Sequence, residues 1–166
     1  MPQLATSQAM NDSDAPVRIG LLGRGIAASR TPRMHMAAAA ELGLPYDYQL
    51  VDSLVRDLPE DAGAILDLLE GEGFHGLNVT YPFKRAMIPA MDELSDAARK
   101  VGAVNTVVFR DGKRFGHNTD HWGFGQSLRD GLPDAARDRV LMIGAGGAGG
   151  AVAHALLDAG TGTLLV

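Results

Sequence analysis

Short apolar segments alternate with amphipathic segments along most of the chain. Apolar runs bounded by glycine or polar residues predict buried strands, and apolar positions three or four residues apart predict helices. In residues 59–70, for example, Ala62, Leu66 and Leu69 recur at a helical spacing. The strands predicted in this way are 17–23, 46–51, 74–80, 104–110, 113–116, 138–144 and 163–166. The predicted helices are 33–42, 59–70, 82–100 with a break near Pro89, 119–129 and 147–159.

The order of these elements predicts an α/β fold. Strands and helices alternate almost throughout, which favours a mainly parallel sheet with helices on its faces. The pair Asp111-Gly112 between two of the strands is typical of a tight hairpin turn. Thr31 and Pro32 mark the start of the 33–42 helix, Thr31 as its N-cap and Pro32 at its first helical position.

The turn-rich segment 131–137 separates two units of the chain. We expect a first α/β unit over residues 16–118, a connecting helix and linker over 119–137, and the start of a second β-α-β unit over 138–166. Residues 1–15 have neither the charged start nor the apolar stretch of a signal peptide, so we expect them to form a disordered tail.

Composition and charge narrow the class of protein. The chain is 46% hydrophobic and 21% charged, as in ordinary globular proteins, and its net charge of −5 disfavours a nucleic-acid partner. It has no cysteine, which excludes disulfides and thiolate metal sites and fits a reducing cytoplasm. No apolar run approaches the roughly 20 residues of a membrane helix, and the five histidines show no metal-ligand spacing. We therefore expect a cytoplasmic protein without a membrane, nucleic-acid or metal partner.

A glycine-rich turn follows the strand predicted over 138–144. Gly144, Gly146 and Gly149 form the pattern G-x-G-x-x-G between a strand and a helix, which is typical of dinucleotide-binding turns. The first glycine makes the sharp turn, the second lets a pyrophosphate approach the backbone, and the third lets helix and strand pack closely. A glycine-rich helix start used only for packing is the alternative. The candidate cofactor-binding residues are Gly144, Ala145, Gly146, Gly147, Ala148 and Gly149.

A second candidate site lies where the strand predicted over 74–80 ends. Asn78, Thr80 and Lys84 belong to the segment NVTYPFK, and ligands of α/β sheets bind at the carboxyl ends of strands. These polar side chains are suited to hold a polyol. Lysine can also exchange a proton during a reaction, which arginine cannot, although a solvated surface lysine fits the same pattern.

Three further polar segments accompany this one. The segment SRTP begins a helix, GAVNT leads into a strand, and NTD begins the helix that leads toward the glycine-rich turn. Each segment also has a purely structural interpretation. Thr31 is then a helix cap, Asn105 a turn residue and Asp120 a carboxylate that interacts with the helix dipole.

Together these segments resemble the shikimate dehydrogenase family. They occur in the order S-x-T-P, N-V-T-x-P-x-K, G-A-V-N-T, N-T-D and G-A-G-G-A-G, and the resemblance covers nearly all of the chain from Val17 onward. It implies a substrate-binding catalytic domain over 16–118 and the truncated start of a Rossmann-type dinucleotide-binding domain over 138–166. In this family the active site lies between the two domains.

The resemblance implies an NAD(P)-dependent oxidoreductase that interconverts shikimate and 3-dehydroshikimate by hydride transfer. This reaction belongs to the shikimate pathway, which leads to chorismate and the aromatic amino acids. Carried over by motif, Lys84 and Asp120 are the catalytic pair. The implied substrate-binding residues are Ser29, Thr31, Asn78, Thr80, Lys84, Asn105 and Asp120.

The segments around Arg24, Thr31 and His117 resemble the bifunctional quinate/shikimate branch of the family. They imply that quinate and 3-dehydroquinate are interconverted as well, as in quinate catabolism, and they favour NAD over NADP. The residue that selects between the two cofactors is expected beyond Val166. The resemblance therefore predicts that these residues form the N-terminal part of a longer enzyme and are inactive alone. It also leaves a homodimer open.

Three alternative functions remain at this point. A related two-domain dehydrogenase could act on a folate one-carbon carrier, although the S-x-T segment suits a small carboxylate. A non-catalytic homologue could bind cyclitol acids, although such a binder has no need of both Lys84 and Asp120. The chain could also be an inactive fragment of an enzyme gene.

Overall fold

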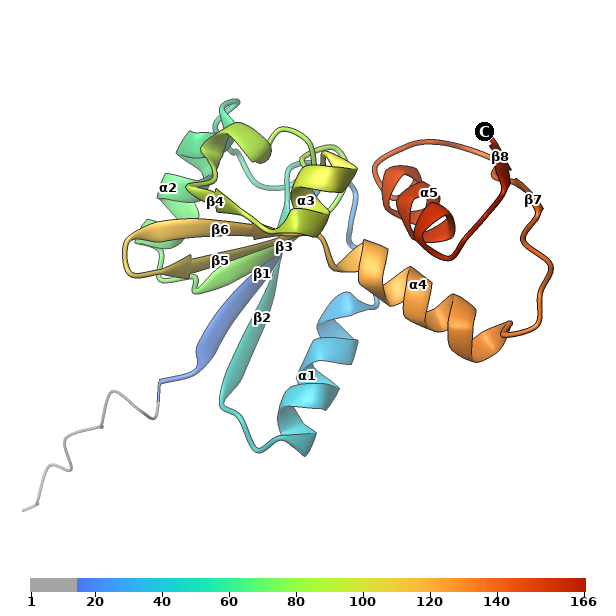
Figure 1. Cartoon of the computed structure of the whole chain (residues 1–166). Coiled ribbons are helices and arrows are strands. Elements are labelled where there is room, and N and C mark those ends of the chain that lie inside the picture. The colour runs from blue at the N-terminus through green and yellow to red at the C-terminus, as the bar shows by residue number, and fades with distance from the viewer. Residues whose placement is uncertain (1–14) are drawn as a thin grey trace, which may run out of the picture.

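The larger of two sheets has six strands in the order β2-β1-β3-β5-β6-β4 (Figure 1). The computed structural model describes residues 15–166, so the tail predicted over residues 1–15 lies, except for Ala15, outside the described residues. The strands are β1 (Val17–Gly23), β2 (Tyr46–Asp52), β3 (Gly76–Val79), β4 (Glu93–Leu94), β5 (Thr106–Arg110) and β6 (Lys113–His117). β1 pairs in parallel with β2 and β3, and β4 pairs in parallel with β6, whereas the β3–β5 and β5–β6 pairs are antiparallel. The edge of the sheet that runs across the strand ends therefore holds the carboxyl ends of β1, β2, β3 and β6 together with the start of β5.

A smaller unit follows at the C-terminal end of the described chain. It contains a parallel pair of strands, β7 (Arg139–Leu141) and β8 (Thr163–Leu165). The helices of the chain are α1 (Thr31–Glu41), α2 (Ala62–Gly71), α3 (Asp96–Val101), α4 (Thr119–Gly131) and α5 (Gly149–Asp158), with a short 3₁₀ helix η2 (Ile88–Ala90). In Figure 1, α1 lies beside β2, and α4 leads from the end of β6 to the unit of β7, α5 and β8.

Polar residues set the starts of three helices. The N-caps are Asp61 for α2, Ser95 for α3 and Asn118 for α4, and each accepts a hydrogen bond from a first-turn backbone N–H. α3 ends at Gly102, whose φ of 68° lies in the left-handed region that favours glycine. This stop turns the chain directly into the segment that contains Asn105. The N-cap at Asn118 and the helix end at Gly102 thus place the segments NTD and GAVNT at the same edge of the sheet.

The main core lies between the larger sheet and the elements α2 and η2. Strands β1, β2, β3 and β5 all contribute to it, so burial of apolar surface fixes their ends relative to one another. The largest fully buried side chains are Leu22, Val51, Ile65, Leu66, Leu69, Leu77, Met87, Val104 and Val107.

The helix predicted over 82–100 with a break near Pro89 is wrong up to residue 95 and confirmed from Asp96 onward, where α3 lies. Before α3 the chain forms turns, then η2 and β4. Pro89 lacks the N–H that an α-helix needs at that position. The next residues pair with β6, since the Asp92 N–H donates to the Arg114 carbonyl at 3.0 Å and the Asp92 carboxylate accepts from the Arg114 N–H at 2.7 Å. Pairing with a distant strand therefore outweighs the local helical pattern.

The α/β class is confirmed, with local corrections. The predicted hairpin is confirmed because Asp111 and Gly112 both have positive φ angles, of 54° and 68°. That hairpin makes β5 and β6 antiparallel, so the parallel pattern holds chiefly for β1, β2 and β3. The N-cap of α1 is Arg30 rather than Thr31, and the Thr31 hydroxyl contacts Ser29 Oγ instead of capping the helix.

The second unit has shorter elements than predicted. β7 ends at Leu141 and α5 begins at Gly149, so residues 142–148 form an irregular connection between them. This connection contains most of the glycine-rich turn. In the part of the chain from 15 to 166, no helix combines the length and the apolar character that crossing a membrane requires.

The core predicts a clear difference between two leucines of α2. Leu66→Ala removes a fully buried side chain and should lower the free energy of unfolding by about 2–5 kcal/mol. Leu68→Ala on the same helix removes a side chain that is 36% exposed and should cost much less. Urea unfolding followed by circular dichroism measures both values, and equal losses would contradict this description of the core.

Candidate active site

A lysine–aspartate ion pair lies at the edge of the sheet where β3 ends. Lys84 lies in the turns after β3, and Asp120 lies in the first turn of α4. The distance from Lys84 Nζ to Asp120 Oδ2 is 2.6 Å, and the two side chains are 14% and 33% exposed. The pair is thus partly shielded from bulk water but remains accessible. A lysine held in this way can exchange a proton with a bound small molecule.

Asn105 holds the carboxylate of Asp120 from the other side. Its Nδ2 donates to Asp120 Oδ1 and to Thr119 Oγ1, both at 2.8 Å. Its Oδ1 accepts from the Thr119 N–H at 2.9 Å and from the Thr106 hydroxyl at 3.0 Å. These bonds use the full hydrogen-bonding capacity of a buried amide. Asn105 therefore orients Asp120, and a substrate hydroxyl would reach it only by replacing one of these bonds.

Asn78 joins the same network through Thr106. Asn78 Nδ2 donates to Thr106 Oγ1 at 3.4 Å, and Asn78 Oδ1 accepts from the Tyr48 hydroxyl at 2.7 Å. Burial, with a smaller effect of Tyr46, raises the pKa of Tyr48, so its hydroxyl remains a donor at ordinary pH. One of the two acceptor positions of the Asn78 amide oxygen is thereby filled. Its amide nitrogen has a second N–H that can serve a ligand.

Ser29 and Thr31 lie at the N-terminus of α1. Ser29 Oγ donates to Thr31 Oγ1 at 3.1 Å and accepts from the Thr31 N–H at 3.2 Å. The Thr31 N–H is used by Ser29 and Pro32 has none, so the Arg33 N–H and the Thr31 hydroxyl are the groups at this helix start that can donate to an anion. The described hydrogen bonds do not join the two residues directly to Lys84. The chain segment that leads to Ser29 and Thr31 contacts the turn that contains Lys84, because the Arg24 N–H donates to the Tyr81 carbonyl at 3.0 Å.

The backbone of the glycine-rich turn has the form that a phosphate site needs. Gly144 has a φ of 98°, and a Cβ on Gly149 would lie 2.8 Å from the Gly144 carbonyl oxygen. Around Gly146, no other residue lies within 4 Å of the place where a side chain would begin. α5 begins at Gly149 without a side-chain cap, and the Gly150 N–H donates to the Gly146 carbonyl at 3.3 Å, so the N–H groups of Gly149 and Ala151 are the ones available to an anion. A dinucleotide pyrophosphate therefore fits this turn.

A cavity of about 410 Å³ lies between this turn and the turns after β3. A Cβ on Gly147 would lie 3.5 Å from Lys84 Cδ, so the two units meet beside the lysine. The cavity is lined by Thr80, Tyr81, Pro82, Lys84, Arg85, Gly146, Gly147 and Ala148. The structure thus brings two candidate substrate residues and the candidate cofactor turn to one cavity, whose lining does not include Ser29, Thr31, Asn78, Asn105 or Asp120.

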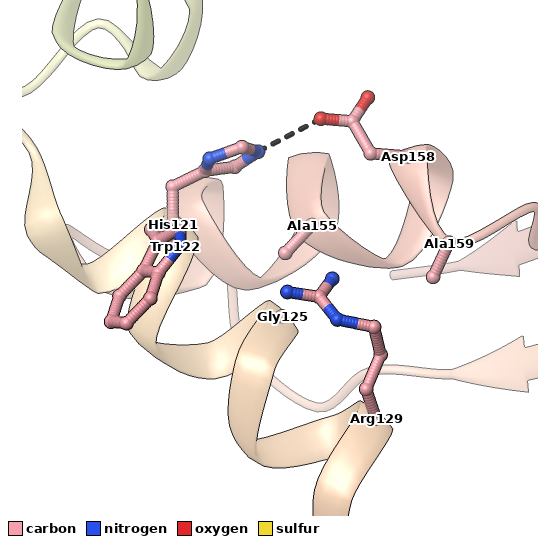
Figure 2. Close-up of a pocket in the computed structure, with 7 residues that line it drawn as sticks. All are labelled: His121, Trp122, Gly125, Arg129, Ala155, Asp158 and Ala159. Atoms are coloured by element: carbon pink, nitrogen blue, oxygen red, sulfur yellow. Dashed lines mark hydrogen bonds and ion pairs between the residues drawn. The ribbon is translucent and has the colours of Figure 1, made fainter. Parts of the chain in front are cut away.

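Contacts between α4 and α5 help to set the position of the second unit. Figure 2 shows His121 reaching from α4 toward Asp158 on α5. His121 Nε2 lies 2.9 Å from Asp158 Oδ2, and Lys100 of α3 donates to Asp158 Oδ1. Lys100 and His121 together hold the pKa of Asp158 below its usual value. One carboxylate therefore ties α3, α4 and α5 together.

Two residues that organise the site are missing from the sequence-based candidates. Tyr48 orients Asn78, and Asp52 at the end of β2 accepts backbone N–H groups from the turn after β1. An aspartate that ends an apolar strand was a usable signal for Asp52. A tyrosine within a strand is ordinary, so no comparable signal marks Tyr48. Within residues 15–166, no three potential metal-ligating side chains gather into a metal site.

Comparison with known families gives one match. The profile of the shikimate dehydrogenase substrate binding domain matches residues 21–107. Among curated proteins, shikimate dehydrogenase (NADP(+)) of Arthrobacter sp. (strain FB24) is 50% identical over 143 residues, covering 86% of this chain and 49% of that protein. Quinate/shikimate dehydrogenase (NAD(+)) of Corynebacterium glutamicum (strain R) is 45% identical over 159 residues, covering 95% and 55%. The chain spans about half the length of the curated relatives it matches.

Solved structures give the same picture. Quinate dehydrogenase from Corynebacterium glutamicum in complex with NAD has a TM-score of 0.84 and 43% identity, covering 90% of this chain and 54% of that one. Shikimate 5-dehydrogenase from Thermus thermophilus in complex with NADP(H) and shikimate has a TM-score of 0.75 and 39% identity, covering 89% and 55%.

The α4–α5 contact predicts a measurable change at Asp158. His121→Ala removes one of its two partners, so the pKa of Asp158 should rise toward its usual value of 3.8 but stay below it because Lys100 remains. The lowered pKa stabilises the folded state above about pH 4, and this contribution is lost as the pH falls through the folded-state pKa. Carboxyl carbon NMR titration of Asp158 measures the shift. His75→Ala, just before β3, serves as the control, and an equal shift of the Asp158 pKa there would contradict the assignment.

Proposed function

The chain belongs to the shikimate dehydrogenase family, and from this we propose that the whole protein is an NAD(P)-dependent oxidoreductase that interconverts shikimate and 3-dehydroshikimate. The observation that carries the proposal is the Lys84–Asp120 pair, since its lysine lines the cavity that the glycine-rich turn borders. A proton-exchanging group and a dinucleotide turn on either side of one cavity are the two parts that an alcohol dehydrogenase needs.

In this proposal, Lys84 moves the proton of the reacting hydroxyl. In the oxidation of shikimate, the neutral amine accepts the hydroxyl proton, and in the reverse direction the ammonium group returns it. Asp120 holds Lys84 Nζ through Oδ2, while Asn105 holds Asp120 through Oδ1. The nicotinamide cofactor, when bound, supplies or accepts the hydride. The backbone N–H groups at the start of α5 and the open backbone at Gly146 bind its pyrophosphate.

The remaining candidate residues bind the substrate in this proposal. Ser29 and Thr31 hold its carboxylate, because their hydroxyls stand at an uncapped helix N-terminus. Asn78 offers an amide N–H and Thr80 a hydroxyl to the ring hydroxyls. Asn105 orients Asp120 through its hydrogen bond to Oδ1. A direct hydrogen bond from Asn105 to a ring hydroxyl of the substrate stays a prediction. The cytoplasmic location and the homodimer stay predictions.

Quinate is proposed as a second substrate. The quinate dehydrogenase neighbour and the bifunctional relative named above support this proposal. Quinate has a hydroxyl on the carbon that bears its carboxylate, where shikimate has a ring double bond. Thr31 keeps a hydroxyl for the carboxylate, but its methyl group restricts its rotation and reshapes that pocket. The relatives divide between NAD and NADP, and we retain NAD as the preferred cofactor.

Lys84→Ala should remove most of the activity of the whole enzyme. The rate of shikimate oxidation at saturating substrate and cofactor should fall about 10²–10⁴-fold, because the variant lacks its general acid and base. Shikimate binding should persist. Lys113→Ala is the matched control, since Lys113 lies in the β5–β6 hairpin and pairs with Glu93 at 3.2 Å. A Lys84→Ala enzyme that keeps more than about a tenth of the rate would refute the role.

The proposal for quinate is tested by steady-state kinetics of the whole enzyme. Shikimate and quinate are each assayed with NAD and with NADP. We expect turnover of both acids and a higher kcat/KM with NAD. Turnover of shikimate without any turnover of quinate would remove the second substrate, and a large preference for NADP would remove the cofactor assignment.

A further inference from the structure

Asp52 is a buried carboxylate that serves backbone N–H groups. It is the last residue of β2 and is 8% exposed. Its Oδ1 accepts from the Gly25 N–H at 2.8 Å and from the Leu54 N–H at 3.0 Å, and its Oδ2 accepts from the Ile26 N–H at 2.8 Å. These bonds, that from Leu54 above all, keep the pKa of Asp52 below its usual value despite the opposing effect of burial. The group is therefore a charged acceptor with three fixed donors.

The turn that Asp52 holds leads directly to Ser29. Gly25 has a φ of 68°, and the Ile26 carbonyl accepts from the Ser29 N–H at 2.9 Å. The orientation of Ile26 therefore fixes where Ser29 begins. Ser29 in turn bonds the hydroxyl and the N–H of Thr31. A continuous chain of hydrogen bonds thus runs from Asp52 to the N-terminus of α1.

The same turn is packed against the strand end that leads to Lys84. A Cβ on Gly23 would lie 2.5 Å from Thr80 Cγ2 and 2.6 Å from Ile26 Cγ2, so the three residues are in close contact. These contacts leave the turn no room to move toward Thr80. Loss of the hydrogen bonds of Asp52 should therefore displace mainly Ser29 and Thr31, which follow the turn.

We propose that Asp52 is a positioning residue, which holds the turn at Gly25 and Ile26 so that Ser29 and Thr31 are pre-arranged for the carboxylate of the substrate. The proposal rests on the proposed function of the site. The substrate carboxylate does not change during the reaction, so its binding contributes equally to the ground state and the transition state. Loss of this arrangement should raise KM and leave kcat nearly unchanged.

Asp52→Asn is the informative substitution. The asparagine has the size of aspartate but replaces one acceptor oxygen with an NH₂ group, which would face a backbone N–H. We expect KM for shikimate to rise about 10-fold or more in the whole enzyme, with kcat within about twofold. Asp47→Asn is the matched control, because Asp47 lies on the same strand and bonds Arg18 and Gln49 instead. It should leave both constants unchanged.

A double-mutant cycle with Ser29→Ala separates positioning from a general loss of structure. If Asp52 acts through Ser29, the KM increases of the two single variants should not multiply in the double variant. Multiplicative effects, a fall in kcat with constant KM, or an equal effect of Asp47→Asn would each overturn the proposal. Circular dichroism checks folding. Asp52→Ser, which keeps one acceptor, replaces Asp52→Asn if that variant is unfolded, and failure of both to fold would overturn a specific positioning role.

Amide hydrogen exchange distinguishes this proposal from the proposed function. Loss of protection at Gly25, Ile26 and Ser29 in Asp52→Asn should occur without substrate. If the wild-type enzyme neither binds nor oxidises shikimate, the proposed function fails, while the exchange data still report whether Asp52 holds the turn. Unchanged protection at these three amides would overturn the positioning role even in an active shikimate dehydrogenase.

Discussion

Three parallel strands, β2, β1 and β3, end at the same edge of the larger sheet, and the site is built on that alignment. Their register places Asp52 opposite Gly23 and places Thr80 directly after β3. The antiparallel hairpin then returns the chain so that Asn105 and Asn118 flank the same edge. Because buried leucines and valines hold these strands, the polar groups at the edge have fixed separations.

Several polar side chains at this edge bond one another. One network runs from Tyr48 through Asn78, Thr106 and Asn105 to Asp120, and then to Lys84. A satisfied network of partly buried groups keeps each member in one orientation, because an unpaired group there would be costly. A second set of bonds around Asp52 orders the start of α1. The lysine is thus held by one network and the start of α1 by the other, and these are the two regions that we propose contact the substrate.

Local signals were sufficient for most elements and for several candidate residues. Asp111-Gly112 predicts its hairpin because positive φ angles are a property of the two residues themselves. The glycine pattern after β7 likewise predicts a turn with positive φ at Gly144. The helix prediction failed over 82–95, where Asp92 and Glu93 pair with β6. That pairing depends on where β6 lies, which the helical pattern of the segment itself does not encode.

By itself, the sequence determined the α/β class, the order of the elements outside residues 82–95 and the motifs that identify the family, since these depend on residues close together in the chain. The tertiary structure decided which side chains meet. Lys84 and Asp120 are 36 positions apart, and Tyr48 and Asn78 are 30 apart. Asp52 and Ile26 are 26 positions apart. Contacts over such separations follow from strand register and from packing of the core, so only the folded chain shows that Asp52 bonds the turn before α1 and that Tyr48 bonds Asn78.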